Sequence, residues 1–363
     1  MNLPHHFRYE SHPQRIVYGE GSIAELPSCV TQLGAERALV LCAAGQRGDA
    51  ERAAAFLGHR AAGLFDGAVM HVPMAVAREA RVLAAKLKAD CLVAFGGGSA
   101  IGLGKAIALE SGMPLIAVPT TYSGSEVTPI YGITDAGIKK TGRDLRVLPR
   151  TVIYDPDLTL SLPIGMSVTS GINAIAHAAE GLYAADGNPV VDLMAQEGIA
   201  ALSRARPGIV EAQDADALRS ARRDALYGSW LCGSVLGTVS IALHHKLCHI
   251  LGGAFNLPHA ETHAIVLPHA LAYNASAVPL AMERIARALR GADAAQAAFD
   301  LARDNGAPIA LKTIGLRQQD LDRACDLALA NPYANPRPLE RAGIRQLLQD
   351  AFDGRRPAHG VSQ

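Results

Sequence analysis

The sequence lacks the features that would tie it to a nucleic acid or to a membrane. Its 34 basic and 34 acidic side chains cancel, so the charge balance gives no sign of a basic surface for nucleic acid. No apolar run is long enough to span a bilayer, and the N-terminus has no apolar signal-peptide core. Repeats of roughly 20–50 residues are also missing. These absences favour a cytoplasmic globular protein with no nucleic-acid or membrane partner.

Paired cysteines are absent as well. Six cysteines are scattered over 363 residues, and none forms a Cys-x-x-Cys pair. This distribution favours reduced thiols in the cytoplasm. The length suggests about two domains, and a hydrophobic content of 49% is enough to build their cores.

The first part of the chain alternates short apolar strands with helices. Strands are expected at residues 15–18, 37–42, 62–65, 90–95 and 114–119. Helices are expected from Ser22 and at residues 49–59, 74–87 and 101–111. This order indicates an α/β domain on a parallel sheet, which we place at residues 1–162.

A glycine-rich loop follows the strand at 90–95. Its residues Gly97, Gly98 and Ser99 stand just before a helix. Glycine lets main-chain N–H groups approach a phosphate, and the start of a helix adds a positive dipole. The loop does not match Gly-x-Gly-x-x-Gly, and a glycine turn can also simply begin a helix. We nevertheless predict that it binds the diphosphate of a dinucleotide.

A second polar loop, at residues 119–126, supports this interpretation. It follows the next strand, so it should reach the same edge of the sheet, where folds of this type bind ligands. The residues expected to flank the diphosphate and the nicotinamide ribose are Thr120, Thr121 and Ser125.

The second part of the chain has a helical pattern throughout. Helices are expected at residues 168–184, 189–203, 215–236, 279–289, 294–305, 318–329 and 339–352. We therefore predict an all-helical domain at residues 163–363. Prolines at both ends of residues 331–338 indicate a structured loop, and the tail at 354–363 is expected to be disordered.

Histidines are concentrated in one stretch of this helical part. Five of the thirteen lie between residues 241 and 264. On a helix, His245 and His249 would share a face, and a turn containing Gly252-Gly253 and Leu257-Pro258 would bring His259 back toward them. A surface cluster or hydrogen-bonded core histidines is the alternative, but the density favours a functional site.

An earlier helix carries a second pair at the same spacing, Asn173 and His177. Two such pairs and His259 could converge on a divalent metal in a helical bundle. Alternatively, Asn173 and His177 only hydrogen-bond to each other and to a neighbouring helix.

Four motifs together resemble the iron-containing alcohol dehydrogenase superfamily. They are GGGSAIGLGK (96–105), PTTYSGSEVTP (119–129), GINAIAHAAEG (171–181) and HHKLCHILGGAFNLPHAETHA (244–264). The resemblance covers nearly the whole chain. It implies an N-terminal dinucleotide domain, a C-terminal helical domain of the dehydroquinate synthase type, and an active site in the cleft between them.

Three segments resemble one branch more closely, the maleylacetate reductases. They are HHKLCH…LPHAETH, YGITDAGIKKTGRD and NPYANPRPL. That branch works without a metal in the bacterial degradation of aromatic rings. The resemblance implies reduction of maleylacetate, a small dicarboxylate, to 3-oxoadipate with NADH or NADPH. It also implies a homodimer.

One position departs from the metal-dependent members, whose helix reads Asp-x-x-x-His. The matching positions here are Asn173 and His177, followed by His245 and His259. A neutral amide is a poor ligand for Fe²⁺ or Zn²⁺ and leaves its charge uncompensated. We therefore expect no metal, and instead a donor-rich pocket that attracts an anion.

The resemblance also implies roles for single residues. His245 and Lys246 would stabilise the enolate or bind a substrate carboxylate, with His177 and His259 in the pocket wall. Asn173 and His244 are further candidates for contact with substrate, and His244 for catalysis. His249 would lie beside the nicotinamide and Lys140 near its ribose. No acid follows the strand at 37–42 until Asp49, so NADPH should be tolerated alongside NADH.

Three other functions remain open at this point. The chain could be a metal-dependent alcohol dehydrogenase that tolerates Asn173, or a lyase of the related dehydroquinate synthase type that uses NAD only transiently. It could also be a ligand-binding protein that has lost catalysis. The residues alone, without the resemblance, indicate an NAD(P)-dependent enzyme with a small anionic substrate.

Overall fold

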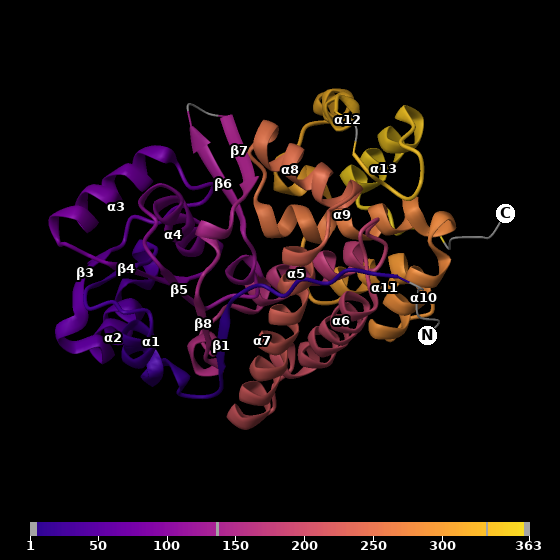
Figure 1. Cartoon of the computed structure of the whole chain (residues 1–363). Coiled ribbons are helices and arrows are strands. Elements are labelled where there is room, and N and C mark those ends of the chain that lie inside the picture. Colours follow the sequence, from indigo (N-terminus) through magenta and orange to yellow (C-terminus); the bar gives the residue numbers. More distant parts are fainter. Residues whose placement is uncertain (1–5, 136–137, 332, 359–363) are drawn as a thin grey trace. The chain divides into compact units, whose positions relative to one another are not determined.

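The computed structural model describes residues 6–135, 138–331 and 333–358. Contacts divide them into two compact units, drawn together in Figure 1. One unit is Ser11–Leu162, and the other begins at Pro163 and includes the described residues before Ser11. This grouping differs from the predicted division at residues 6–10, which form no strand and so are not held by the sheet.

The first unit is built on a six-stranded parallel sheet, as the apolar strands predicted. The strand order is β1-β8-β5-β4-β2-β3. The strands are β1 (Arg15–Tyr18), β2 (Ala38–Leu41), β3 (Ala61–Phe65), β4 (Cys91–Gly96), β5 (Leu115–Pro119) and β8 (Thr151–Tyr154). Strands β2, β4 and β5 are fully buried, because a parallel sheet is covered on both faces.

Helices cover both faces of this sheet (Figure 1). Helices α1 (Leu26–Gln32) and α2 (Arg47–Leu57) pack on one face, where alternate strand residues such as Val40, Val93 and Ile116 form a core. On the other face lie α3 (Met74–Lys86) and α4 (Gly98–Ser111). Helix α4 comes close to the sheet at Gly104, where a Cβ would meet the side chains of Leu115 and Ala94.

Between residues 120 and 162, where the sequence pattern predicts no element, the structure has three strands. An antiparallel hairpin is formed by β6 (Ile130–Asp135) and β7 (Ile138–Arg143). Strand β8 inserts between β1 and β5 in the main sheet. At four residues, β8 is too short for periodicity alone to reveal it.

The second unit is helical, as predicted. Its helices are α5 (Ile164–Gly181), α6 (Pro189–Val210), α7 (Ala215–Thr238), α8 (Leu243–Phe255), α9 (His259–Asn274), α10 (Pro279–Ala288), α11 (Ala294–Arg303), α12 (Leu321–Leu329) and α13 (Arg341–Asp353). Helix α5 is buried over most of its length. A core of apolar residues from α8, α9, α12 and α13 packs beside it in the same unit.

Several predicted boundaries were wrong. Helix α6 continues past residue 203 to Val210, with Pro207 inside it. The predicted turn at Gly252 and Gly253 is wrong, because both glycines lie within α8 and the chain turns at Asn256, whose φ is 54°. Tertiary packing holds helices through residues that local signals mark as breakers.

The C-terminal segment is more ordered than predicted. Arg356 forms a bidentate ion pair with Asp300 at 2.8 and 2.6 Å, and Gln296 donates to the carbonyl of Pro357 at 3.1 Å. The prediction of disorder is therefore wrong for residues 354–358, and residues 359–363 lie outside the described part of the chain. The predicted structured loop at 331–338 is confirmed where it is described, since Asn335 bonds to both Asn274 and the carbonyl of Arg337.

Within the described residues, no individual helix has the length and apolarity needed to cross a membrane. Helices α7 and α8 meet that test only as a pair bent by 94°.

Candidate active site

The helical unit gathers the histidines around one buried carboxylate, Glu180. Its oxygens accept the main-chain N–H groups of Ala242 at 2.8 Å and His244 at 2.7 Å, at the start of α8. A carboxylate in this position satisfies helix N–H groups and is favoured by the helix dipole. Glu180 thereby ties α5 to the first turn of the histidine-rich helix.

The same carboxylate begins a chain of side-chain hydrogen bonds. Glu180 Oε2 lies 2.7 Å from His245 Nδ1, and His245 Nε2 lies 2.7 Å from His177 Nδ1. His177 Nε2 is 3.3 Å from the Asn173 amide nitrogen. All four side chains are buried. The two predicted pairs therefore do converge, and the expected Asn173–His177 contact is one link in a longer chain.

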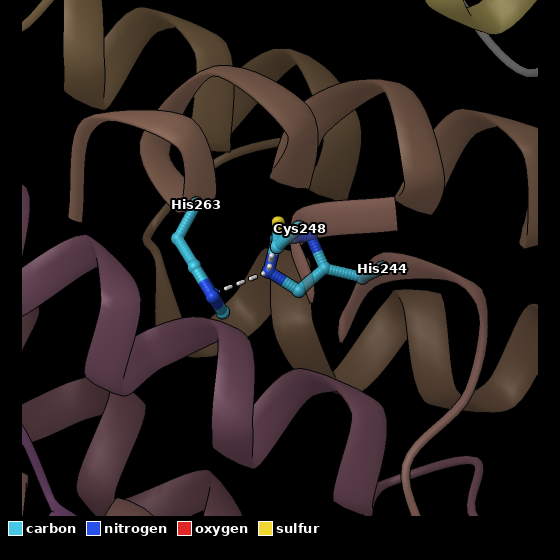
Figure 2. A group of neighbouring side chains, drawn as sticks. All are labelled: His244, Cys248 and His263. Atoms are coloured by element: carbon cyan, nitrogen blue, oxygen red, sulfur yellow. Dashed lines mark hydrogen bonds between the residues drawn. The ribbon is translucent and has the colours of Figure 1, made fainter. Parts of the chain in front are cut away.

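His244 points elsewhere, because neighbouring residues on a helix face different directions. It is fully buried, and its Nε2 lies 3.0 Å from His263 Nδ1 and 3.8 Å from the Cys248 sulfur (Figure 2). Burial lowers the pKa of both His244 and His263 well below the usual value, so both rings are neutral. This placement does not favour the predicted contact between His244 and substrate.

The His244, Cys248 and His263 side chains form a compact set of metal-type donors. Their ligand atoms lie within 4.8 Å of one another, and no other such set of three occurs among the described residues. Nitrogen and sulfur donors suit a soft cation. A cation would require the thiolate, however, and burial raises the pKa of Cys248 well above its usual value.

The remaining predicted residues lie around these two groups. His249 is half-buried with its ring centroid 6.2 Å from that of His245, and His259 starts α9 with its ring 4.3 Å from His263. Lys246 places its ammonium 5.5 Å from the ring centre of Tyr333, which belongs to the loop before α13. The structure thus brings all the predicted histidines and Lys246 into one neighbourhood of the helical unit.

In the sheet unit, the two predicted loops meet at the ends of β4 and β5. A Cβ on Gly97 would come within 3.0 Å of Thr121, and one on Gly98 within 3.8 Å of Ser123. Gly96 has a φ of 138°, which favours glycine. Helix α4 starts at Gly98, three residues earlier than predicted, so Ser99 lies in its first turn. These are the features of a phosphate site at a helix N-terminus.

Gln46 joins this loop from the end of β2. Its amide donates to the Thr120 hydroxyl at 2.7 Å, and its side-chain oxygen would contact a Cβ at Gly96. No acid follows β2 before Asp49, and the side chain that reaches this loop is the neutral Gln46. Lys140, by contrast, is an exposed residue of the hairpin strand β7 and pairs with Asp135 at 3.6 Å.

A buried lysine, Lys105, stabilises the segment that follows β5 through hydrogen bonds. The Lys105 ammonium donates to the carbonyls of Ser125, Thr128 and Ile130 at 2.6–2.9 Å, and to the Thr128 hydroxyl at 3.0 Å. Burial lowers the pKa of Lys105 to about 7, against the opposing charge of Glu126, and burial raises the pKa of Glu126.

Comparison with known families covers both units. The family described as iron-containing alcohol dehydrogenase matches residues 13–156. The C-terminal part of the same family matches residues 167–352.

The chain belongs to the iron-containing alcohol dehydrogenase family.

Individual relatives within this family are close. A maleylacetate reductase from Burkholderia cepacia is 59% identical over 352 residues, which cover 97% of this chain and 99% of the relative. A maleylacetate reductase from Sphingobium indicum is 55% identical, with 97% of this chain and 99% of the relative covered. The crystal structure of maleylacetate reductase from Agrobacterium tumefaciens superposes with a TM-score of 0.92 at 50% identity, covering 98% and 100% of the two chains.

Within this iron-containing alcohol dehydrogenase fold, sequence reasoning missed several residues that complete the site. The missed residues are Gln46, Lys105, Glu180, Cys248, His263 and Tyr333. A signal was available for Glu180, which follows His177 by three residues and so shares its helix face. No comparable local signal marks Gln46 or Tyr333.

Proposed function

We propose that this chain reduces maleylacetate to 3-oxoadipate with a nicotinamide cofactor. The observation that supports this best is identity of 54–59% to maleylacetate reductases over nearly the full chain. The ammonium of Lys246, which lies beside the buried histidine chain, is a donor of the kind that a dicarboxylate needs. A metal-dependent alcohol dehydrogenase is the less favoured alternative.

The reaction adds a hydride and a proton across a carbon–carbon double bond that is conjugated with a ketone. When bound, NADH or NADPH supplies the hydride for the alkene carbon β to that ketone. The displaced electron pair moves onto the ketone oxygen, and a proton then adds to the α carbon. Donors aimed at the oxygen stabilise this enolate, as in an oxyanion hole.

The chain's residues take the following roles in this proposal. Lys246 donates to the enolate oxygen or to a substrate carboxylate, and His245 does so once it has gained a second proton and its Nε2 has turned from His177 to the substrate, while His177, Asn173 and His259 shape the pocket. A histidine can also supply the proton for the α carbon. Gly97, Gly98 and Ser99 hold the cofactor diphosphate, and Thr120, Thr121 and Ser125 flank it. The roles of His249 and Lys140 beside the cofactor remain predictions.

Iron, which the family name implies, does not fit the donors of the histidine chain as they stand. Both ring nitrogens of His177 lie within hydrogen-bond distance of Asn173 and His245, and Glu180 already accepts three hydrogen bonds. The site therefore offers no anionic oxygen in place of the family's Asp, and its nitrogens are engaged with each other. We propose that the reaction is metal-independent.

Three further features complete the proposal. Gln46 carries no charge to repel a 2′-phosphate, so either NADH or NADPH serves as the cofactor.

The enzyme works in the cytoplasm, where its six free cysteines stay reduced. It assembles as a homodimer, by analogy with its family, and β1 lies at an open edge of the sheet.

The decisive assay is NADH oxidation with maleylacetate, using enzyme stripped by a strong chelator and checked for residual metal. We expect full activity in the stripped enzyme and one NADH consumed per 3-oxoadipate formed. Activity that disappears and returns with Fe²⁺ or Zn²⁺ would restore the metal-dependent alternative. Lack of turnover in both states would refute the substrate.

A further inference from the structure

Glu180 and Asn173 stand at opposite ends of the buried hydrogen-bonded chain. We propose that Glu180 is a positioning residue, which fixes the tautomer and orientation of His245, and that Asn173 completes the chain as a hydrogen-bond donor. This inference rests on the proposed function for its kinetic consequence. It does not rest on that function for its structural content.

The direction of the chain follows from Glu180. The main-chain N–H groups of Ala242 and His244 can only donate, so both carboxylate oxygens act as acceptors. Because Oε2 of the carboxylate accepts from Ala242 and lies 2.7 Å from His245 Nδ1, the proton of this link is on that nitrogen. In the neutral ring, His245 Nε2 is then the acceptor.

The next links follow by elimination. His245 Nε2 lies 2.7 Å from His177 Nδ1, which must therefore carry the proton. The centroid separation of 5.0 Å and the interplanar angle of 28° agree with an in-plane hydrogen bond, in which the rings meet edge to edge. His177 Nε2 is left as an acceptor, and it faces the nitrogen of the Asn173 amide.

This direction explains why an amide suits position 173. Asn173 can donate to His177 Nε2, whereas an aspartate can only accept and would require a proton there. With a carboxylate at each end, Glu180 and the new aspartate would each need a histidine N–H pointing toward it. The donor-to-acceptor directions required from the two ends would then oppose each other. With neutral rings, His177 Nδ1 and His245 Nε2 would both be acceptors and would face each other without a proton. Such an unsatisfied contact lowers the stability of a buried site.

Glu180 acts through His245. It bonds to the ring of His245 and also to the start of α8, the helix that carries this residue. Its bonds to the first turn of α8 fix the position of His245 relative to α5, and its bond to Nδ1 fixes the rotation of the His245 ring. Such a partner behind a catalytic imidazole orients it and fixes its tautomer. In hydrolase triads, a wrong tautomer lowers kcat by about 10⁴-fold.

The first test compares Glu180→Gln with Glu180→Met. Gln can keep an oxygen facing Ala242 and His245, while its NH2 group replaces the oxygen that accepts from the His244 N–H, so we expect lower stability but a His245 still protonated at Nδ1 and a kcat that falls less than about tenfold. Met removes the acceptor, so kcat should fall by about 10²-fold or more while KM changes little. Nitrogen NMR of the imidazoles, assigned with His177→Gln and His245→Gln, reports the tautomers directly.

The second test changes the other end and covers the case in which Glu180→Met fails to fold. Asn173→Asp, kept in chelator, should alter the His177 and His245 imidazole signals and lower kcat at least about tenfold. Asn188→Asp is the matched control, because Asn188 only accepts, from Val190 and Val191 at 3.1 Å, and a carboxylate serves equally.

Two outcomes would overturn the proposal. One is a folded Glu180→Met enzyme with unchanged kcat and unchanged His245 signals, and the other is the same result for Asn173→Asp. The imidazole signals need neither NADH nor maleylacetate. An inactive wild-type enzyme would therefore refute the proposed function while the tautomers still decide this inference.

Discussion

At the scale of single residues, the chemistry of this protein depends on how each buried polar group is paired. Glu180 is almost inaccessible and accepts three hydrogen bonds, two of them from the start of α8. His263 has its Nδ1 3.0 Å from His244, while its Nε2 has no hydrogen-bond partner among the described residues. The neutral ring of His263 resists charging, because burial lowers its pKa well below the usual value.

His269 on α9 shows this most clearly. Its ring packs 6.5 Å from that of Phe299, and burial lowers its pKa to about 4. Because the unfolded chain takes up this proton near pH 6.5, the neutral form stabilises the fold above that pH. The contribution is lost as the pH falls from 6.5 toward 4, and it amounts to about 3 kcal/mol.

Chemical denaturation at a series of pH values measures this dependence. The free energy of unfolding of the wild type should decline between pH 6.5 and pH 4, and His269→Leu should show a flatter decline. His59→Gln serves as the control, since that histidine is exposed. Parallel curves for wild type and His269→Leu would mean that other groups cause the acid sensitivity; His244 and His263, whose pKa values are also lowered, are the first candidates.

At the scale of secondary-structure elements, the two loops proposed to bind the cofactor are held from within the sheet unit. Helix α4 begins directly at the glycine loop and also carries Lys105. The ammonium of Lys105 then gathers three carbonyls of the segment that follows β5. One helix thus positions both loops, because its first turn adjoins the glycine loop and its middle carries Lys105, which bonds to the second loop.

Replacing Lys105 by Met should loosen that second loop. Three carbonyls, one buried and two partly buried, would lose their donor, so we expect the free energy of unfolding to fall by about 2–4 kcal/mol and NADH to bind more weakly. Denaturant titration and fluorescence titration with NADH measure the two effects. Lys86→Met, at an exposed position on α3, is the control. Wild-type stability in Lys105→Met would contradict the assignment.

At the scale of the whole molecule, the two units share one property, the complete burial of their thiols. All six cysteines are free and buried, and three lie in each unit. Burial raises the pKa of every one of them, for example that of Cys42 to about 11. Since the thiolate is the reactive form, these thiols should be chemically inert in the folded protein.

A thiol-reactive dye tests this property near neutral pH. The native enzyme should react slowly at all six positions, and unfolding in denaturant should expose six fast-reacting thiols. Mass spectrometry of the labelled peptides identifies any exception. Fast labelling of a cysteine in the native enzyme would show local opening around it.

The sequence alone determined the two fold classes, the glycine loop, the helical pairs of Asn173 with His177 and of His245 with His249, and the family. Periodicity and short motifs suffice for these features, because they depend on residues close together in the chain. Tertiary structure decided that Glu180 meets His245 across 65 residues, and that His244 turns toward His263 and Cys248. It also decided that Lys105 holds the polar loop. Periodicity shows which residues share one face of a helix, but only packing decides which neighbour that face meets.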